Sequence, residues 1–180
     1  MTGLRGIVLT IDPGLTGTGF SLWDDFEGKD LEPRTSGIIR SSSAKTWTDK
    51  ATVVTQKFIQ LLLNERERFK GENPMEHPEI TVVIEFPELY TSSVSHAAGV
   101  KGDLFKLAYL AGRLTEATRS VYGSGGTTVI LINPSTWKGQ LTKVAVQEWI
   151  KRITGRKASY RDHEADAIGM ALFLKGRFQP

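Results

Sequence analysis

Acidic side chains occur at three widely separated places where an apolar segment of the sequence ends or is interrupted. Asp12 closes the largely apolar run at 5–12, and Glu85 lies near the end of the run at 79–86. Asp166 is the one charged residue in the segment 165–174. A buried carboxylate is costly unless it is paired or bound to a metal ion. We therefore expect these three acids to converge on a cation.

Two further polar residues stand close to the third acid. Asp162 and His163 precede Asp166 by four and three residues, so on a helix both can share its face. The residues alone leave open which of the two joins the acids as a fourth ligand. The sequence contains no cysteine, so oxygen and imidazole are the available ligands, and these favour hard cations. For any single acid, the alternative is a strand-end carboxylate that faces water.

Alternation and helical spacing predict the elements that position these acids. Strands are expected at 5–12, 17–23, 35–41, 79–86 and 127–133. Helices are expected at 48–69, 103–122, 141–153 and 162–175. This order predicts one α/β domain over 1–180, with a mixed five-stranded sheet in which three antiparallel strands continue into parallel βα units, flanked by helices. If the strands of Asp12 and Glu85 run parallel side by side, both side chains emerge at one sheet edge.

Three motifs resemble those of a known family. The stretches "IDPGLTGTGFSLW", "VVIEF" and "DHEADAIGMAL" are similar to the acidic motifs of RuvC-type Holliday junction resolvases, in the RNase H-like superfamily, in matching order and spacing. The resemblance implies an RNase H-like fold in which Asp12, Glu85 and Asp166 hold Mg²⁺ or Mn²⁺, two ions per active site. His163 stands where family members carry aspartate or histidine. Asp162 departs from the pattern, and phage-like relatives carry an acid at that place.

The resemblance implies a function as well as a fold. We expect a divalent-metal-dependent, structure-selective DNA endonuclease that acts as a homodimer. It would resolve four-way DNA junctions by paired symmetric nicks that leave 5′-phosphate and 3′-hydroxyl ends. Two alternatives are another RNase H-like nuclease, which cuts RNA/DNA hybrids or branched DNA, and a junction-binding scaffold that does not cut.

The charge balance permits a nucleic-acid partner. The sequence has 23 Lys and Arg against 20 Asp and Glu, a net charge of +3. Lysines that follow the fifth strand resemble family lysines that contact the scissile backbone, a basic segment precedes the last helix, and an aromatic residue after the fourth strand could stack on a base. The candidate DNA-binding residues are Lys138, Lys143, Arg156, Lys157 and Tyr90. Each lysine has the alternative of a solvated charge. Phe86 is a second stacking candidate, and its alternative is core packing.

The turn after Asp12 is rich in small residues. Gly14, Thr16, Gly17 and Gly19 are expected to leave space for a DNA backbone, with ordinary turn chemistry as the alternative. The same stretch, "DPGLTGTG", is also similar to the phosphate loop of actin-like and sugar-kinase-like ATPases. Those proteins close a second similar domain over the nucleotide, so no nucleotide cofactor is expected here.

The sequence also suggests where the protein resides and how it assembles. No apolar stretch approaches the ~20 residues that span a bilayer, so we expect a cytoplasmic protein without a membrane partner. The cell in which it acts could be a phage-infected host. Phe105 and Tyr109 stand partly outside the apolar stripe of the helix at 103–122. In the family this helix contributes to the dimer interface, which makes both residues candidates for it. The alternative is that they cover the edge of the core.

Overall fold

A five-stranded mixed sheet forms the centre of the structure, a computed structural model that describes residues 6–41, 44–72, 79–88, 102–123, 125–155 and 160–177. The strands are β1 (Ile7–Asp12), β2 (Gly17–Trp23), β3 (Thr35–Arg40), β4 (Ile80–Glu85) and β5 (Thr127–Ile132). Their order is β3-β2-β1-β4-β5. β2 pairs antiparallel with β1 and β3, whereas β4 pairs parallel with β1 and β5. The predicted mixed α/β sheet is confirmed.

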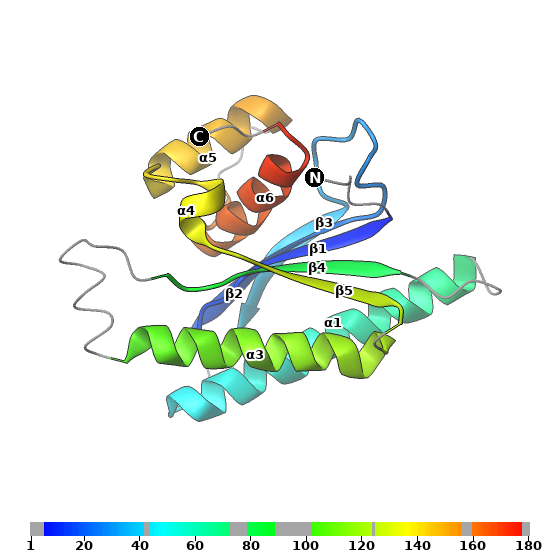
Figure 1. The fold of residues 1–180 in the computed structure, drawn as a ribbon, viewed down its shortest axis with the longest axis vertical. Helices are drawn as coiled ribbons and strands as arrows, with labels where there is room; N and C mark the ends of the chain where they lie inside the picture. The colour runs from blue at the N-terminus through cyan, green and yellow to red at the C-terminus, as the bar shows by residue number, and fades with distance from the viewer. Residues whose placement is uncertain are drawn as a thin grey trace.

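Helices cover both faces of this sheet. They are α1 (Trp47–Glu72), α3 (Asp103–Tyr122), α4 (Pro134–Trp137), α5 (Lys143–Thr154) and α6 (Asp162–Leu174). Figure 1 shows α1 and α3 on one face of the sheet and α4, α5 and α6 on the other. Each face has its own cluster of buried apolar side chains. Among the described helices, none has the length and apolar content needed to cross a membrane.

The alternation of side chains along β1 decides which face receives Asp12. Leu9 and Ile11 belong to the core beneath α1 and α3. Thr10 points the other way, and its hydroxyl donates a hydrogen bond of 2.7 Å to the Ala167 carbonyl of α6. Asp12 follows two residues after Thr10, so the period of two directs it toward α6 as well.

β4 repeats this alternation beside β1. Ile84 joins the core beneath α1 and α3, whereas Val83 joins the cluster of α5 and α6, which places Glu85 on the α6 side. In the parallel register, Ile11 lies opposite Ile84. Asp12 and Glu85 therefore leave adjacent strands at the same edge and on the same face, as the sequence predicts.

Several helix boundaries differ from the prediction by one to three residues, and one helix is not predicted. α1 begins after a reciprocal cap in which the Asp49 N–H donates to Thr46 Oγ1 at 3.1 Å and the Thr46 N–H to Asp49 Oδ2 at 3.4 Å. It runs to Glu72, beyond the predicted end at 69. The prediction also omits α4, because a helix of four residues that starts at Pro134 is too short to show helical periodicity.

Candidate active site

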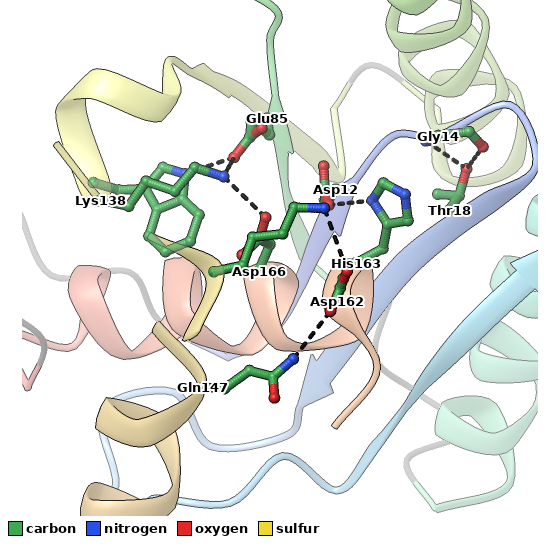
Figure 2. Close-up of polar contacts among 11 residues, drawn as sticks. Asp12, Gly14, Thr18, Glu85, Lys138, Gln147, Asp162, His163 and Asp166 are labelled. Atoms are coloured by element: carbon green, nitrogen blue, oxygen red, sulfur yellow. Dashed lines mark hydrogen bonds and ion pairs between the residues drawn. The ribbon is translucent and has the colours of Figure 1, made fainter. Parts of the chain in front are cut away.

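Asp12, at the end of β1, lies against His163 in the first turn of α6 (Figure 2). The His163 Nδ1 atom is 2.6 Å from Asp12 Oδ2. Asp12 is only 6% exposed. The hydrogen bond to Asp12 raises the pKa of His163, and burial of the ring opposes this only in part. His163 therefore keeps a proton to higher pH than a free histidine does.

Glycines in the β1–β2 hairpin allow α6 to approach this closely. A Cβ atom at Gly19 would lie 1.9 Å from the His163 carbonyl oxygen, and one at Gly14 would lie 3.0 Å from the His163 ring. Either side chain would force α6 or its histidine away from Asp12. At Gly19 the α6 backbone fills the space that a side chain would need, and at Gly14 the Gly17 carbonyl and the His163 ring fill it. These contacts favour close packing within the protein as the reason for both glycines, over the expected space for a DNA backbone.

Glu85 and Asp166 are bridged by the ammonium group of Lys138. The Lys138 Nζ atom is 2.9 Å from Asp166 Oδ2 and 3.3 Å from Glu85 Oε2. The neighbouring Trp137 donates its indole N–H to the same Glu85 oxygen at 2.8 Å. Trp137 is the last residue of the short helix α4 and Lys138 is its C-cap, so two consecutive residues contact the acids here. Figure 2 shows Lys138 between Glu85 and Asp166.

The sequence did not predict that residues at the end of α4 contact the acids. It proposed Lys138 as a DNA contact and identified neither its ion pairs with acids distant in sequence nor any part for Trp137. The usable signal was position: a lysine soon after the end of β5 can reach the sheet edge that carries Glu85, because β4 and β5 run parallel. The ion pairs themselves depend on where α4 turns, and no spacing rule predicts that.

Burial and the nearby negative charge raise the pKa values of two of these acids. Burial, followed by the charge of Asp12, raises the pKa of Glu85 to about 7. The same two causes raise the pKa of Asp166. Burial lowers the pKa of Lys138, but Glu85 and Asp166 outweigh this and hold that pKa above its ordinary value. The acids thus favour a cation among them, and Lys138 provides one.

Asp162 points away from this group toward α5. Its Oδ1 atom accepts a hydrogen bond of 3.0 Å from Gln147 Nε2, and its Oδ2 atom lies 3.4 Å from Lys143 Nζ (Figure 2). The Asp162 side chain is 55% exposed. Of the two alternatives for the fourth position, His163 is the residue that contacts an acid of the cluster, and Asp162 links α6 to α5.

The other predicted residues have mixed outcomes. Three candidates for DNA binding lie outside the described residues: Tyr90, Arg156 and Lys157. Phe86 packs against the core beneath α1 and α3, which favours its alternative role. On α3, Phe105 is 67% exposed and Tyr109 is 38% exposed. Both rings lie edge-on to Trp47, with centroids 6.2 Å and 5.4 Å from it.

The donor types in this site suit a divalent cation. Over the ranges that the structure describes, no three Asp, Glu or His side chains converge closely enough to form a metal-binding group. The side chains that meet here are nevertheless carboxylates and one imidazole, which are ligands for Mg²⁺ and Mn²⁺. The ammonium of Lys138 occupies the place of a cation between Glu85 and Asp166. A divalent ion fits the chemistry of this group if Lys138 moves aside.

Comparison with known proteins supports the fold assignment. No protein-family model matches the sequence, and no curated protein matches it. Among solved structures, Thermus thermophilus RuvC superposes with a TM-score of 0.60 at 23% identity, over 93% of this chain and 92% of that chain. T. thermophilus RuvC in complex with a Holliday junction substrate gives 0.59 at 23% identity, over 94% and 92%. The predicted resemblance is thereby confirmed at the level of the fold, which is RNase H-like.

Proposed function

We propose that this protein is a divalent-metal-dependent DNA endonuclease that resolves four-way junctions. The observation that carries the proposal is a set of contacts on one face of the sheet: Asp12, at the end of β1, contacts His163 of α6, and Lys138 bridges Glu85, at the end of the parallel strand β4, to Asp166 of α6. The fold adds support, because a protein that shares it, T. thermophilus RuvC, has been solved with a Holliday junction substrate. A protein that only bound DNA would gain nothing from clustered acids beside phosphates.

The ligands proposed for two Mg²⁺ or Mn²⁺ ions are Asp12, Glu85 and Asp166, with His163 as the fourth. When bound, the ions would neutralise charge on the attacking and leaving oxygens of a phosphodiester. The chain itself contributes rigid placement, since the acids come from two central strands and a buried helix. Asp12 and Asp166 are each 6% exposed, so the chain also shields the group from bulk water.

Lysines near the acids are the proposed phosphate contacts. Lys138 would exchange its ion pairs with Glu85 and Asp166 for a phosphate oxygen once another cation occupied the acids. Lys143, whose side chain is 65% exposed, stands at the start of α5 beside Asp162.

In the proposed reaction, water adds to phosphorus and gives up a proton. The bond from phosphorus to the 3′ oxygen breaks, and that oxygen leaves with a proton. The products are a 5′-phosphate and a 3′-hydroxyl, which a ligase can rejoin.

The proposed homodimer uses the exposed apolar side of α3. Phe105, Tyr109 and the edge-strand residue Leu131 are 67%, 38% and 51% exposed. Tyr109 and Leu131 also line a shallow groove together with Phe86. A four-way junction has two strands of like polarity related by two-fold symmetry, and a C2 dimer would present one acidic cluster to each.

A panel of four labelled substrates tests this function. Wild-type protein is incubated with a four-way junction, a linear duplex, a flap and an RNA/DNA hybrid, each with Mg²⁺ or with EDTA. We expect paired nicks in the junction, in Mg²⁺ alone, at symmetric positions. Preferred cutting of the hybrid would instead identify another RNase H-like nuclease. Tight junction binding without cutting in Mg²⁺ would identify a scaffold.

A further inference from the structure

Trp137 is buried at the junction of α4 and α6, next to the acidic cluster. Its side chain is fully buried and belongs to the apolar cluster of α5 and α6. On α6 it passes over Gly169, where a Cβ atom would lie 2.8 Å from the indole ring. Packing therefore confines the Trp137 ring, in addition to its hydrogen bond.

The indole N–H of this confined ring holds Glu85. Its nitrogen lies 2.8 Å from Glu85 Oε2, and Lys138 Nζ approaches the same oxygen at 3.3 Å. Within the described part of the chain, the contacts found for Glu85 therefore both fall on Oε2. The other oxygen, Oε1, is the one left for a further ligand.

The two donors differ in how readily they can be replaced. Lys138 carries a mobile ammonium on a flexible stem, and a divalent cation or a phosphate can compete for its place between Glu85 and Asp166. Trp137 is a neutral donor that cannot accept a hydrogen bond and cannot turn away from its packed site. When Lys138 leaves, the indole is the donor that remains on Glu85.

We propose that Trp137 is a positioning residue that fixes Glu85 by Oε2, so that the carboxylate keeps its orientation when a divalent cation displaces the Lys138 ammonium. The inference rests on the proposed function, because it concerns the cation that this function requires. Trp137 touches neither the cation nor DNA in this account. It acts on the cation through Glu85, and its ring also lies beneath the Lys138 ammonium, whose Nζ atom is 4.8 Å from the ring centroid.

A spectroscopic signature tests the contact without metal or DNA. The chain contains four tryptophans, and the Trp137→Phe variant identifies the indole N–H resonance of Trp137. A bond to a carboxylate is charge-assisted, so Glu85→Gln should move that resonance upfield. Asp162→Asn, at a neighbouring acid without this contact, should leave it in place. An unchanged chemical shift of the Trp137 indole N–H in Glu85→Gln would overturn the proposal. This variant keeps the Trp137 ring intact.

Mn²⁺ binding measured by calorimetry, again without DNA, tests the consequence. Loss of a partner that orients a metal ligand typically weakens metal binding by about 10- to 100-fold, so Trp137→Phe should bind Mn²⁺ more weakly by about that factor. Lys138→Met removes the competing ammonium and should bind Mn²⁺ more tightly. These opposite signs distinguish the roles of two adjacent residues.

Trp23→Phe is the matched control. Trp23 is 2% exposed in the same apolar cluster and donates its indole N–H to Ser21 Oγ at 2.9 Å, away from the acids. The Trp23→Phe variant should lose about as much stability as Trp137→Phe and should keep the Mn²⁺ affinity of the wild type. Equal Mn²⁺ affinity in Trp137→Phe and Trp23→Phe would reduce Trp137 to a packing residue and overturn the proposal. Absence of Mn²⁺ binding by the wild type would overturn the metal-dependent function, and the indole resonance would still decide whether Trp137 holds Glu85.

Discussion

At the scale of single residues, the site is a group of acids whose mutual repulsion is partly relieved by basic partners. Asp12 is hydrogen-bonded to His163, while Lys138 bridges Glu85 and Asp166. Burial and the charge of Asp12 still raise the pKa of Glu85 to about 7. The metal-free site is therefore under electrostatic stress that a bound divalent ion would relieve.

The raised pKa of Glu85 predicts how metal-free stability changes with pH. The folded pKa of about 7 lies above the ordinary value of 4.5, so the folded chain holds this proton more tightly. The free energy of unfolding should then fall as pH rises from about 4.5 to about 7. Glu85→Gln removes this titration, so relative to the variant the wild type should lose roughly 1–3 kcal/mol across that interval. Urea unfolding in EDTA at several pH values measures the difference.

Mg²⁺ provides the internal control for that measurement. An ion that binds the folded wild type alone should restore stability above pH 7 and leave the variant less affected. A stability difference between wild type and variant that stays constant from pH 5 to pH 8 would show that Glu85 has no raised pKa.

Sequence reasoning identified the residues that carry this stress but not their partners. Asp12, Glu85 and Asp166 could be predicted because each breaks an apolar segment at the end of a strand or inside a buried helix. The bridge through Lys138 and the hydrogen bond from Trp137 could not, because they depend on the tertiary position of a single helical turn. Asp162 and His163 were indistinguishable by spacing, and only the rotation of α6 about its axis separates them.

At the scale of elements, the β1–β2 hairpin and α6 form one unit through the close contact at Gly19. A network of ion pairs also joins the other end of β2 to α1. Arg34 and Arg68 each pair with both Asp24 and Glu65, and Glu65 is 7% exposed. Strand β2 is thus held at one end by the site helix and at the other by a network of four charges.

Glu65→Gln should loosen that network in a pH-dependent way. Burial raises the pKa of Glu65, but hydrogen bonds from Arg34 and Arg68 outweigh it and hold the pKa below its usual 4.5. The carboxylate therefore stabilises the fold above pH 4.5, and this contribution is lost as pH falls through the folded pKa. The Glu65→Gln substitution should lower the free energy of unfolding by about 1–3 kcal/mol at pH 7, and by progressively less as the pH falls.

Glu67→Gln on the same helix is the control for Glu65. Glu67 is 69% exposed and pairs only with Lys70 in the described structure, so its loss should cost less than about 0.5 kcal/mol. Chemical unfolding of the two variants at pH 7 and pH 4 compares them. Equal costs at both sites would mean that the four-charge network contributes nothing beyond a surface ion pair.

The elements themselves were largely predictable. All five strands and four of the helices follow from alternation, helical spacing and capping residues such as Thr46 and Asp49. The sequence did not reveal α4, which has no periodicity to show, or that Gly19 makes room for α6. Close approaches between elements are set by the assembled sheet, so a local pattern cannot indicate them.

At the scale of the whole molecule, the sheet order brings distant segments together. β4 and β5 insert beside β1 in parallel, and this gathers acids from the start, middle and end of the chain on one face. The opposite face carries α3 (Figure 1). Phe105 and Tyr109 of this helix remain exposed. The face that carries the acids and the proposed dimer surface are therefore separated by the sheet.

The double variant Phe105→Glu, Tyr109→Glu should convert the proposed dimer into a folded monomer. Charges at a buried apolar interface are costly, whereas at these exposed positions they leave the monomer core unchanged. Paired nicking should be lost, because one subunit presents one site. Val144→Glu, at a residue that is 72% exposed on α5, is the control and should leave oligomeric state unchanged. Light scattering at micromolar concentration decides: a dimeric double variant or a monomeric wild type would exclude α3 as the interface.

The most direct test of the central claim compares cutting and binding of one labelled four-way junction by wild type and Asp166→Asn. Loss of a charged ligand should reduce cleavage in Mg²⁺ by at least about 100-fold. Binding should stay equal or become tighter, because the substitution removes an anion that faces phosphates. The account predicts a wild type that nicks the junction in Mg²⁺ but not in EDTA, and a variant that binds without nicking. Cleavage by Asp166→Asn at the wild-type rate would contradict it.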